Sequence, residues 1–374
     1  MDDEVIRTKF RDIRRVVKQT AVSSLSRVLI PRLQDPTDPH SSDDLYTLLQ
    51  SRDADDIVWE TIAERDEIER HLTEYNWASF RAASESPCGH GVIHDANSFS
   101  SLSPASMNLL EGEIPQEWHQ DDEALKAFLA SFAIPDKVKQ AGEITTEISA
   151  EDVLYGFKNW RETTTTSPSG QHLGHYQSLI QNPVLLSCFV KLMNIAIQNG
   201  IAIHRWSRAI NVMIEKDIGQ PKMNRPRIIH LFEADLNLFL KLQWGFRLVR
   251  RALDFGLLHD GQHGSIPRRT ALAPIVLTQL TTDLCCILKH NFARFDNNAS
   301  ACYVRIIVAL AMLAARKCGM PPHAVRSHSD ALLFMQYAVK TVDGISEKTY
   351  QGTIFEPLFG TGQGSGVEHH HRHG

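Results

Sequence analysis

One segment of the chain combines residue types that divalent metal ions bind. It reads Phe-Asp-Asn-Asn-Ala-Ser-Ala-Cys-Tyr from Phe295 to Tyr303, with a carboxylate at Asp296 and a carboxamide at Asn298. Mg²⁺ prefers carboxylate oxygens, whereas the amide of Asn offers one uncharged oxygen. If the segment ends a strand, the two side chains lie on the same face, roughly 6–7 Å apart. Asp296 is therefore a weak candidate metal ligand, and an ordinary junction between a strand and a helix is the alternative.

A second segment has the pattern of a β-hairpin with basic residues at its tip. The apolar run 210–214 is followed by Lys216, a turn that contains Gly and Pro, and a second apolar run that begins at Arg227. Arg suits bidentate contact with phosphate and Lys suits a point contact. The pattern predicts a phosphate-binding hairpin, and a solvated basic hairpin is the alternative. Less favoured basic residues in the turn are Lys222 and Arg225.

Two further segments combine Gly with polar or basic side chains. The first runs from Gln262 to Thr270 and contains Arg268 and Arg269. The second is a Gly-rich stretch around Gln363. Gly permits close approach of the backbone to a ligand, and Arg side chains contact phosphates. Arginines that cap their own loop are the alternative for the first segment.

In their order and spacing, six segments across residues 163–366 resemble the motifs of reverse transcriptases, the RNA-directed DNA polymerases, from non-LTR-type retroelements. The six segments are Ser167–Gly170, Trp206–Lys216, Asn224–Ile229, Gln262–Gly264, Phe295–Tyr303 and Gly362–Ser365. In that family, an aromatic residue five positions after a metal-binding Asp packs under the sugar of the nucleotide. Tyr303 takes the aromatic position, and counting back five residues gives Asn298. The resemblance therefore implies that Asn298 marks the position of a lost catalytic carboxylate, with Asp296 as a poor substitute.

The resemblance also implies binding roles for basic and Gln side chains. Lys216 and Arg227 occupy positions that bind the triphosphate of a dNTP, and Gln363 occupies a position that supports template and nucleotide. The implied partners are an RNA template, a DNA primer and a dNTP. The positions implied to lie near the nucleic acid are Gln262, Arg268 and Arg269.

Two features predict that this chain does not catalyse nucleotidyl transfer. One is Asn298, and the other is the absence from the sequence of an aromatic-x-Asp-Asp motif after the Gln363 segment. We expect a degenerate reverse transcriptase, for which Mg²⁺ or Mn²⁺ is the cofactor if the chain is active. The alternatives are a residual nucleic-acid-binding module and a non-enzymatic retroelement relic.

Charge is distributed unevenly along the chain. The formal net charge of −5 combines +3 over residues 1–30, −17 over residues 31–160 and +9 over residues 161–374. The basic part contains the motifs, as expected for a surface that binds phosphates. A solvated domain with a modest surplus of bases is the alternative.

Composition predicts an intracellular protein. The sequence has no run of about 18 apolar residues, its first residues are acidic, and none of its six cysteines forms a Cys-x-x-Cys pair. These features predict reduced thiols and no membrane insertion. We expect a nuclear or cytoplasmic location. The sequence does not indicate an oligomeric state.

Periodicity predicts helices that alternate with short strands, an α+β fold. The fold that the resemblance implies is a helical N-terminal region followed by fingers and an incomplete split-βαβ palm. The expected strands are 210–214, 227–231, 291–295 and 353–355. The expected helices include 1–30, 42–76, 121–132, a helix after a capping box at 149–152, 183–200, 232–255, 271–291 and 304–318.

Four regions are expected along the chain. Residues 1–80 read as a charged helical region and residues 81–120, which are rich in Ser, Asn, Gly and Pro, as a poorly ordered linker. Residues 121–366 hold the fingers and partial palm implied by the resemblance. Residues 367–374 read as a tail outside the family.

Overall fold

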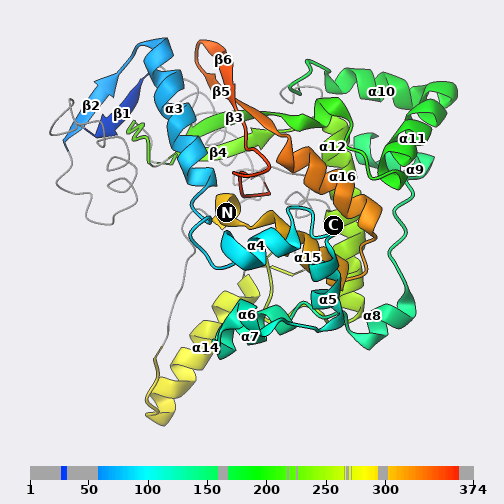
Figure 1. The fold of residues 1–374 in the computed structure, drawn as a ribbon. Coiled ribbons are helices and arrows are strands. Elements are labelled where there is room, and N and C mark those ends of the chain that lie inside the picture. Colours follow the sequence, from blue (N-terminus) through cyan, green and yellow to red (C-terminus); the bar gives the residue numbers. More distant parts are fainter. Residues whose placement is uncertain are drawn as a thin grey trace, which may run out of the picture.

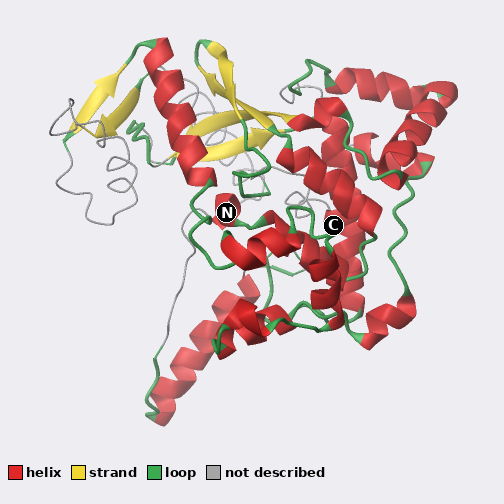
Figure 2. Ribbon diagram, viewed as in Figure 1, coloured by secondary structure: helices red, strands yellow, loops and turns green. Residues whose placement is uncertain are grey.

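The structure is a computed structural model, and it contains both helices and sheets (Figures 1 and 2). This mixture confirms the α+β prediction. The residues that it describes are 27–31, 58–158, 167–216, 219–224, 226–264, 266, 269–270, 272–293 and 302–361.

A four-stranded sheet in the order β4-β3-β5-β6 occupies the centre of the fold. β3 (Arg208–Glu215) pairs antiparallel with β4 (Pro226–Leu231) and parallel with β5 (Gln336–Thr341). β6 (Gly344–Tyr350) pairs antiparallel with β5. The first two predicted strands are confirmed as β3 and β4.

The other two predicted strands are wrong where the structure describes them. Residues 291–293 form no strand, and the sheet ends at Tyr350 before the run 353–355 begins. Ile354 and Phe355 are largely exposed, and the described residues of this run form no strand. β5 and β6, which the sequence analysis did not predict, complete the sheet instead.

One face of the sheet is covered by α3 (Arg65–Phe80). The buried side chains of α3 recur at helical spacing, so a single stripe of the helix meets the sheet. Phe80, at the end of this stripe, stacks on Tyr337 of β5 with ring centroids 5.3 Å apart. Tyr337 in turn stacks on Tyr350 of β6 at 5.2 Å. This aromatic layer fixes α3 across β5 and β6.

A group of helices packs beside the sheet and holds most of the main core (Figure 1). Trp206, which is fully buried, stacks on Phe239 at 5.5 Å. The predicted helices 183–200, 232–255 and 304–318 are confirmed in outline, and so is the capping box, in which Ser149 and Asp152 exchange hydrogen bonds. The helices are α9 (Ala150–Lys158), α10 (Leu173–Gln181), α11 (Pro183–Gln198), α12 (Ala234–Leu240), a π-helical stretch (Lys241–Leu248), α13 (Val249–Asp254), α15 (Val308–Lys317) and α16 (Pro322–Leu333).

Helices and a buried core occupy residues 81–120, for which the composition predicted a poorly ordered linker. They contain α4 (Gly91–Asn97), α5 (Pro104–Glu111) and α6 (Gln116–His119). The Ser and Asn residues on which the linker prediction was based cap these helices and join them to each other. Ser103 caps α5, and the Ser106 hydroxyl donates to Asn97 at 2.9 Å.

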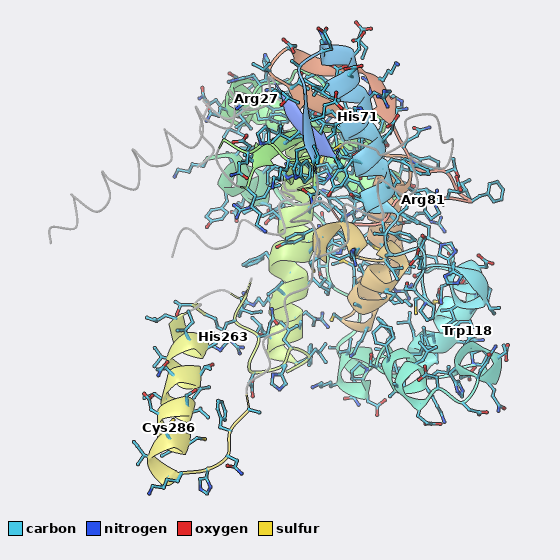
Figure 3. All side chains as sticks on the ribbon, turned by 90° about the vertical axis from the view of Figure 1, so that its left-hand side faces the viewer. Arg27, His71, Arg81, Trp118, His263 and Cys286 are labelled. Atoms are coloured by element: carbon cyan, nitrogen blue, oxygen red, sulfur yellow. The ribbon has the colours of Figure 1, made fainter. Side chains whose placement is uncertain are left out.

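The same region builds a second, smaller core. Leu109 and Leu110 are fully buried, and Trp118 packs with them against Leu313 of α15. α7 (Glu123–Ala130), which confirms the helix expected at 121–132, contributes Leu129, and α8 (Asp136–Ala141) follows it. Figure 3 shows Trp118 in this group of short helices.

The N-terminal region contains strands where helix was expected. β1 (Val28–Pro31) and β2 (Trp59–Ile62) form a two-stranded antiparallel sheet before α3. The remainder of the helix expected over 1–30, and the first part of the one expected over 42–76, lie outside the described residues. α3 confirms the C-terminal part of the second prediction.

α14 (Leu272–Leu288) confirms the helix expected over 271–291 and stands apart from the other elements in Figure 3. None of its residues is buried. Within the described residues, no single helix is long and apolar enough to cross a membrane, although the bent pair α10–α11 passes that test together by length and composition.

Candidate functional site

The tip of the β3–β4 hairpin brings two predicted phosphate ligands together. In the strand register Arg227 is the partner of Ile214, and Lys216 follows the last residue of β3. Both basic side chains are exposed. Neither makes an ion pair or hydrogen bond with any residue in the part of the chain that the structure describes. The two charges are therefore available to an anionic ligand.

The hairpin turn is held in place by its own acidic residue. A carboxylate oxygen of Glu215 accepts a hydrogen bond from the backbone N–H of Gly219 at 3.0 Å. Gly219 has φ +83°, in the left-handed region that favours glycine. This contact closes the turn directly after Lys216.

β1 fixes the other side of the turn. The Leu29 N–H donates to the Pro221 carbonyl at 2.9 Å, and the Met223 N–H donates to the Leu29 carbonyl at 3.0 Å. Lys222 lies 5.0 Å from the ring centroid of Trp59 in β2, a cation–π contact. The sequence analysis did not predict this support, which engages Lys222 and leaves Lys216 and Arg227 as the exposed pair. Arg225 lies outside the described residues.

Tyr303 lies in a short 3₁₀ helix, η4 (Cys302–Arg305), that packs along α3. Its side chain is 41% exposed. On α3, the Tyr75 hydroxyl donates to the Asn224 carbonyl of the hairpin turn at 3.4 Å. Burial raises the pKa of Tyr75, while a hydrogen bond with Ser79 and the charge of Arg305 oppose the shift. α3 therefore links the segment of Tyr303 to the hairpin tip.

The segment before Gln363 is held against η4. The Gly360 N–H donates to the Ile306 carbonyl at 2.7 Å, and Gly360 has φ +98°. A Cβ at this position would lie 2.7 Å from the Tyr303 carbonyl oxygen, so only glycine fits. The structure thus brings Gly360, just before the Gln363 segment, into contact with the segment of Tyr303, although the two are far apart in the sequence. Asp296, Asn298 and Gln363 themselves lie outside the described residues.

The Gln262 segment forms a self-contained loop. Nη1 of Arg269 donates to the carbonyls of Asp260 at 2.8 Å and Gln262 at 2.7 Å. The Gln262 amide donates to the Gly264 carbonyl at 2.9 Å. Arg269 therefore caps its own loop, which is the alternative that the sequence left open. Arg268 lies outside the described residues.

A buried acidic cluster, which sequence reasoning missed, joins β4 to the helices. Glu233 is fully buried, and its two carboxylate oxygens accept hydrogen bonds from the Ser169 N–H at 2.7 Å and the Ser169 hydroxyl at 2.9 Å. Asp235, also fully buried, forms an ion pair with Arg205. Burial, followed by the charge of Asp235, raises the pKa of Tyr176 beside them. The sequence signal was an acidic pair, Glu-Ala-Asp, between a strand and a helix.

Metal binding is not assigned to the described residues. Among them, no group of three or more His, Cys, Asp or Glu side chains has the geometry to hold a metal ion. Asp296, the candidate ligand for Mg²⁺ or Mn²⁺, is outside that part of the chain.

No family model matches the sequence, and no curated protein is significantly similar to it.

Proposed function

We propose that this chain is a reverse-transcriptase-like protein that binds nucleic acid and nucleotide phosphates. The observation that carries the proposal is the exposed pair Lys216 and Arg227 at the tip of a hairpin. In the fingers of a reverse transcriptase, such a hairpin lies over the incoming nucleotide. The order of the six motifs and the net +9 of residues 161–374 support the same assignment.

Within this proposal, the hairpin, η4 and α3 form the binding surface. α3 contacts the hairpin turn through Tyr75 and the Asn224 carbonyl, and it also packs against η4, which contains Tyr303. A triphosphate at Lys216 and Arg227 would then place its sugar toward Tyr303. An RNA template and a DNA primer are the proposed macromolecular partners.

We further propose that nucleotidyl transfer is lost. Asn298 stands where the family has a metal-binding carboxylate, and a neutral amide is a poor ligand for a hard cation. Purified chain incubated with template–primer, dNTPs and either Mg²⁺ or Mn²⁺ is expected to extend no primer above a no-enzyme control. Metal-dependent extension would reject this part of the proposal and leave the binding role in place.

The binding proposal predicts a defined loss on removal of the hairpin charges. Lys216→Gln combined with Arg227→Gln is expected to weaken binding of a labelled template–primer duplex about tenfold or more. The slope of log K against log salt is expected to fall by about 2, because each phosphate contact contributes roughly 0.9 for B-form DNA. Fluorescence anisotropy over a salt series measures both quantities.

Matched charge changes far from the hairpin provide the control. Lys191 on α11 and Arg250 on α13 are both exposed, and Arg250 makes only an exposed ion pair with Asp254 at 3.7 Å. Lys191→Gln with Arg250→Gln therefore removes two positive charges, as the hairpin variant does. This double variant should leave the salt slope nearly unchanged. Equal losses in the two double variants would show a general effect of net charge and would contradict a hairpin site.

A further inference from the structure

A cavity of about 550 Å³ lies at the end of the sheet opposite the hairpin tip. It is bordered by the stretch before β3, the end of α16 and the start of β5. Figure 1 shows the chain passing from α16 into β5. Arg208, at the first position of β3, lines it. Eight residues of extended strand separate Arg208 from Lys216, a distance of roughly 26 Å. The cavity is therefore distinct from the proposed hairpin site.

The cavity has an apolar part formed by exposed side chains. Phe334 follows the last residue of α16 and is 54% exposed, and Ile201 is 55% exposed. Such exposure leaves a flat aromatic surface in contact with solvent inside a concavity. Ligand pockets combine apolar surface of this kind with a few convergent polar groups.

The polar part of the cavity combines a basic, an acidic and two amide side chains. Arg208 and Gln336 are register partners across β3 and β5, so their side chains lie next to each other on one face of the sheet. Asp330 of α16 and Gln351 after β6 line the same cavity. None of these side chains forms a hydrogen bond or ion pair with a residue that the structure describes.

Arg208 and Asp330 line one cavity without forming an ion pair with each other. Burial raises the pKa of Asp330, and the charge of Arg326 opposes the shift. An arginine, a carboxylate and two side-chain amides can together satisfy a ligand that has an anionic group and a flat ring with both donors and acceptors. These are the features of a nucleoside phosphate.

We propose that this cavity binds a nucleoside monophosphate unit, with its base stacked on Phe334 and its phosphate at Arg208. The amides of Gln336 and Gln351 and the Asp330 carboxylate face the edge of the base. Guanine is the preferred base, because its ring N–H and exocyclic amino group donate together to one carboxylate, whereas adenine presents a single exocyclic donor. The unit is a free nucleotide or one residue of a single strand.

The inference does not rest on the proposed hairpin function, and the test separates the two. GMP and AMP are titrated into the full chain by calorimetry, and a labelled single-stranded oligonucleotide that contains G is titrated by anisotropy. Saturable binding of GMP identifies a free nucleotide as ligand. If the oligonucleotide binds but GMP does not, and Phe334→Ala abolishes that binding, the ligand is one nucleotide within a single-stranded nucleic acid.

Two variants at exposed positions test the assigned contacts. Phe334→Ala and Arg208→Gln are each expected to weaken binding about tenfold, through lost stacking and a lost charged contact. Phe334→Tyr should retain binding, and Asp330→Asn should bring the affinities for GMP and AMP close together. Lys216→Gln should not affect GMP binding.

Two results would overturn the nucleotide proposal. The first is the absence of saturable binding of GMP and of the oligonucleotide. The second is binding that Phe334→Ala and Arg208→Gln leave unchanged while circular dichroism shows both variants folded.

Discussion

Glu233→Ala is expected to lower the free energy of unfolding by about 3 kcal/mol, one of the two largest effects predicted for this chain. The Glu233 carboxylate is fully buried and accepts both the N–H and the hydroxyl of Ser169. Its removal takes the acceptor from the Ser169 N–H and leaves the Ser169 hydroxyl with the Ser167 hydroxyl, 3.4 Å away, as its neighbour. A hydrogen bond to a charged group contributes about 1.5–3 kcal/mol, and Glu233→Ala removes two of them. Urea denaturation followed by circular dichroism measures the change.

Two further variants separate the charge of Glu233 from its hydrogen bonds. Glu233→Gln keeps the shape and an acceptor for the Ser169 N–H, so it should cost about 1 kcal/mol. Ser169→Ala removes the hydroxyl alone and should cost a similar amount. If Glu233→Ala costs less than either of these, the carboxylate does not hold Ser169 in place and the proposed role of the cluster is wrong.

Local patterns in the sequence predicted the elements whose residues interact with near neighbours. The β3–β4 hairpin follows from two apolar runs around a turn with Gly and Pro, and α11 follows from apolar residues at helical spacing. β5 and β6 also had a local signal, because Asp343-Gly344 lies between β-branched and aromatic residues. Their parallel pairing with β3 joins segments far apart in the chain, and local periodicity does not determine such a pairing.

For the candidate site, too, the sequence predicted contacts between near neighbours in the chain but not contacts between distant segments. Lys216 and Arg227 meet because one turn joins their strands, so their proximity follows from the sequence. The Glu233 cluster joins Ser169 to a residue 64 positions later, and Arg205 to one 30 positions later. The cavity at Arg208 forms where the end of α16 and the start of β5 pack beside the stretch before β3. Both arise only when distant segments pack, so the local acidic pattern at Glu233 and Asp235 does not predict their partners Ser169 and Arg205.

His328 should make the chain sensitive to acid. The residue lies in α16, is 3% exposed, and contacts the edge of Trp244 with ring centroids 4.4 Å apart. Neither ring nitrogen has a hydrogen-bond partner among the described residues. Burial lowers the pKa of His328 to about 3, because a charged imidazolium is costly in an apolar environment. The native state therefore holds this ring neutral.

The sign of the pH dependence follows from the two pKa values. Below about pH 6.5 the unfolded chain binds a proton at this position that the folded chain does not bind, so stability falls as the pH decreases toward about 3. The loss is about 2 kcal/mol at pH 5, at 1.36 kcal/mol per pH unit. Above about pH 6.5 the ring is neutral in both states and contributes no slope.

His328→Leu is the matched variant, because it removes the titrating ring and keeps an apolar side chain against Trp244. Other acidic contacts, such as Asp235 with Arg205, weaken in both proteins, so the informative quantity is the difference between them. We expect His328→Leu to gain about 2 kcal/mol relative to the parent chain between pH 7 and pH 5. Urea denaturation at the two pH values measures this gain. A His328 ring proton whose NMR shift titrates near pH 6.5 in the folded chain would contradict the assignment, because it would place the ring in water.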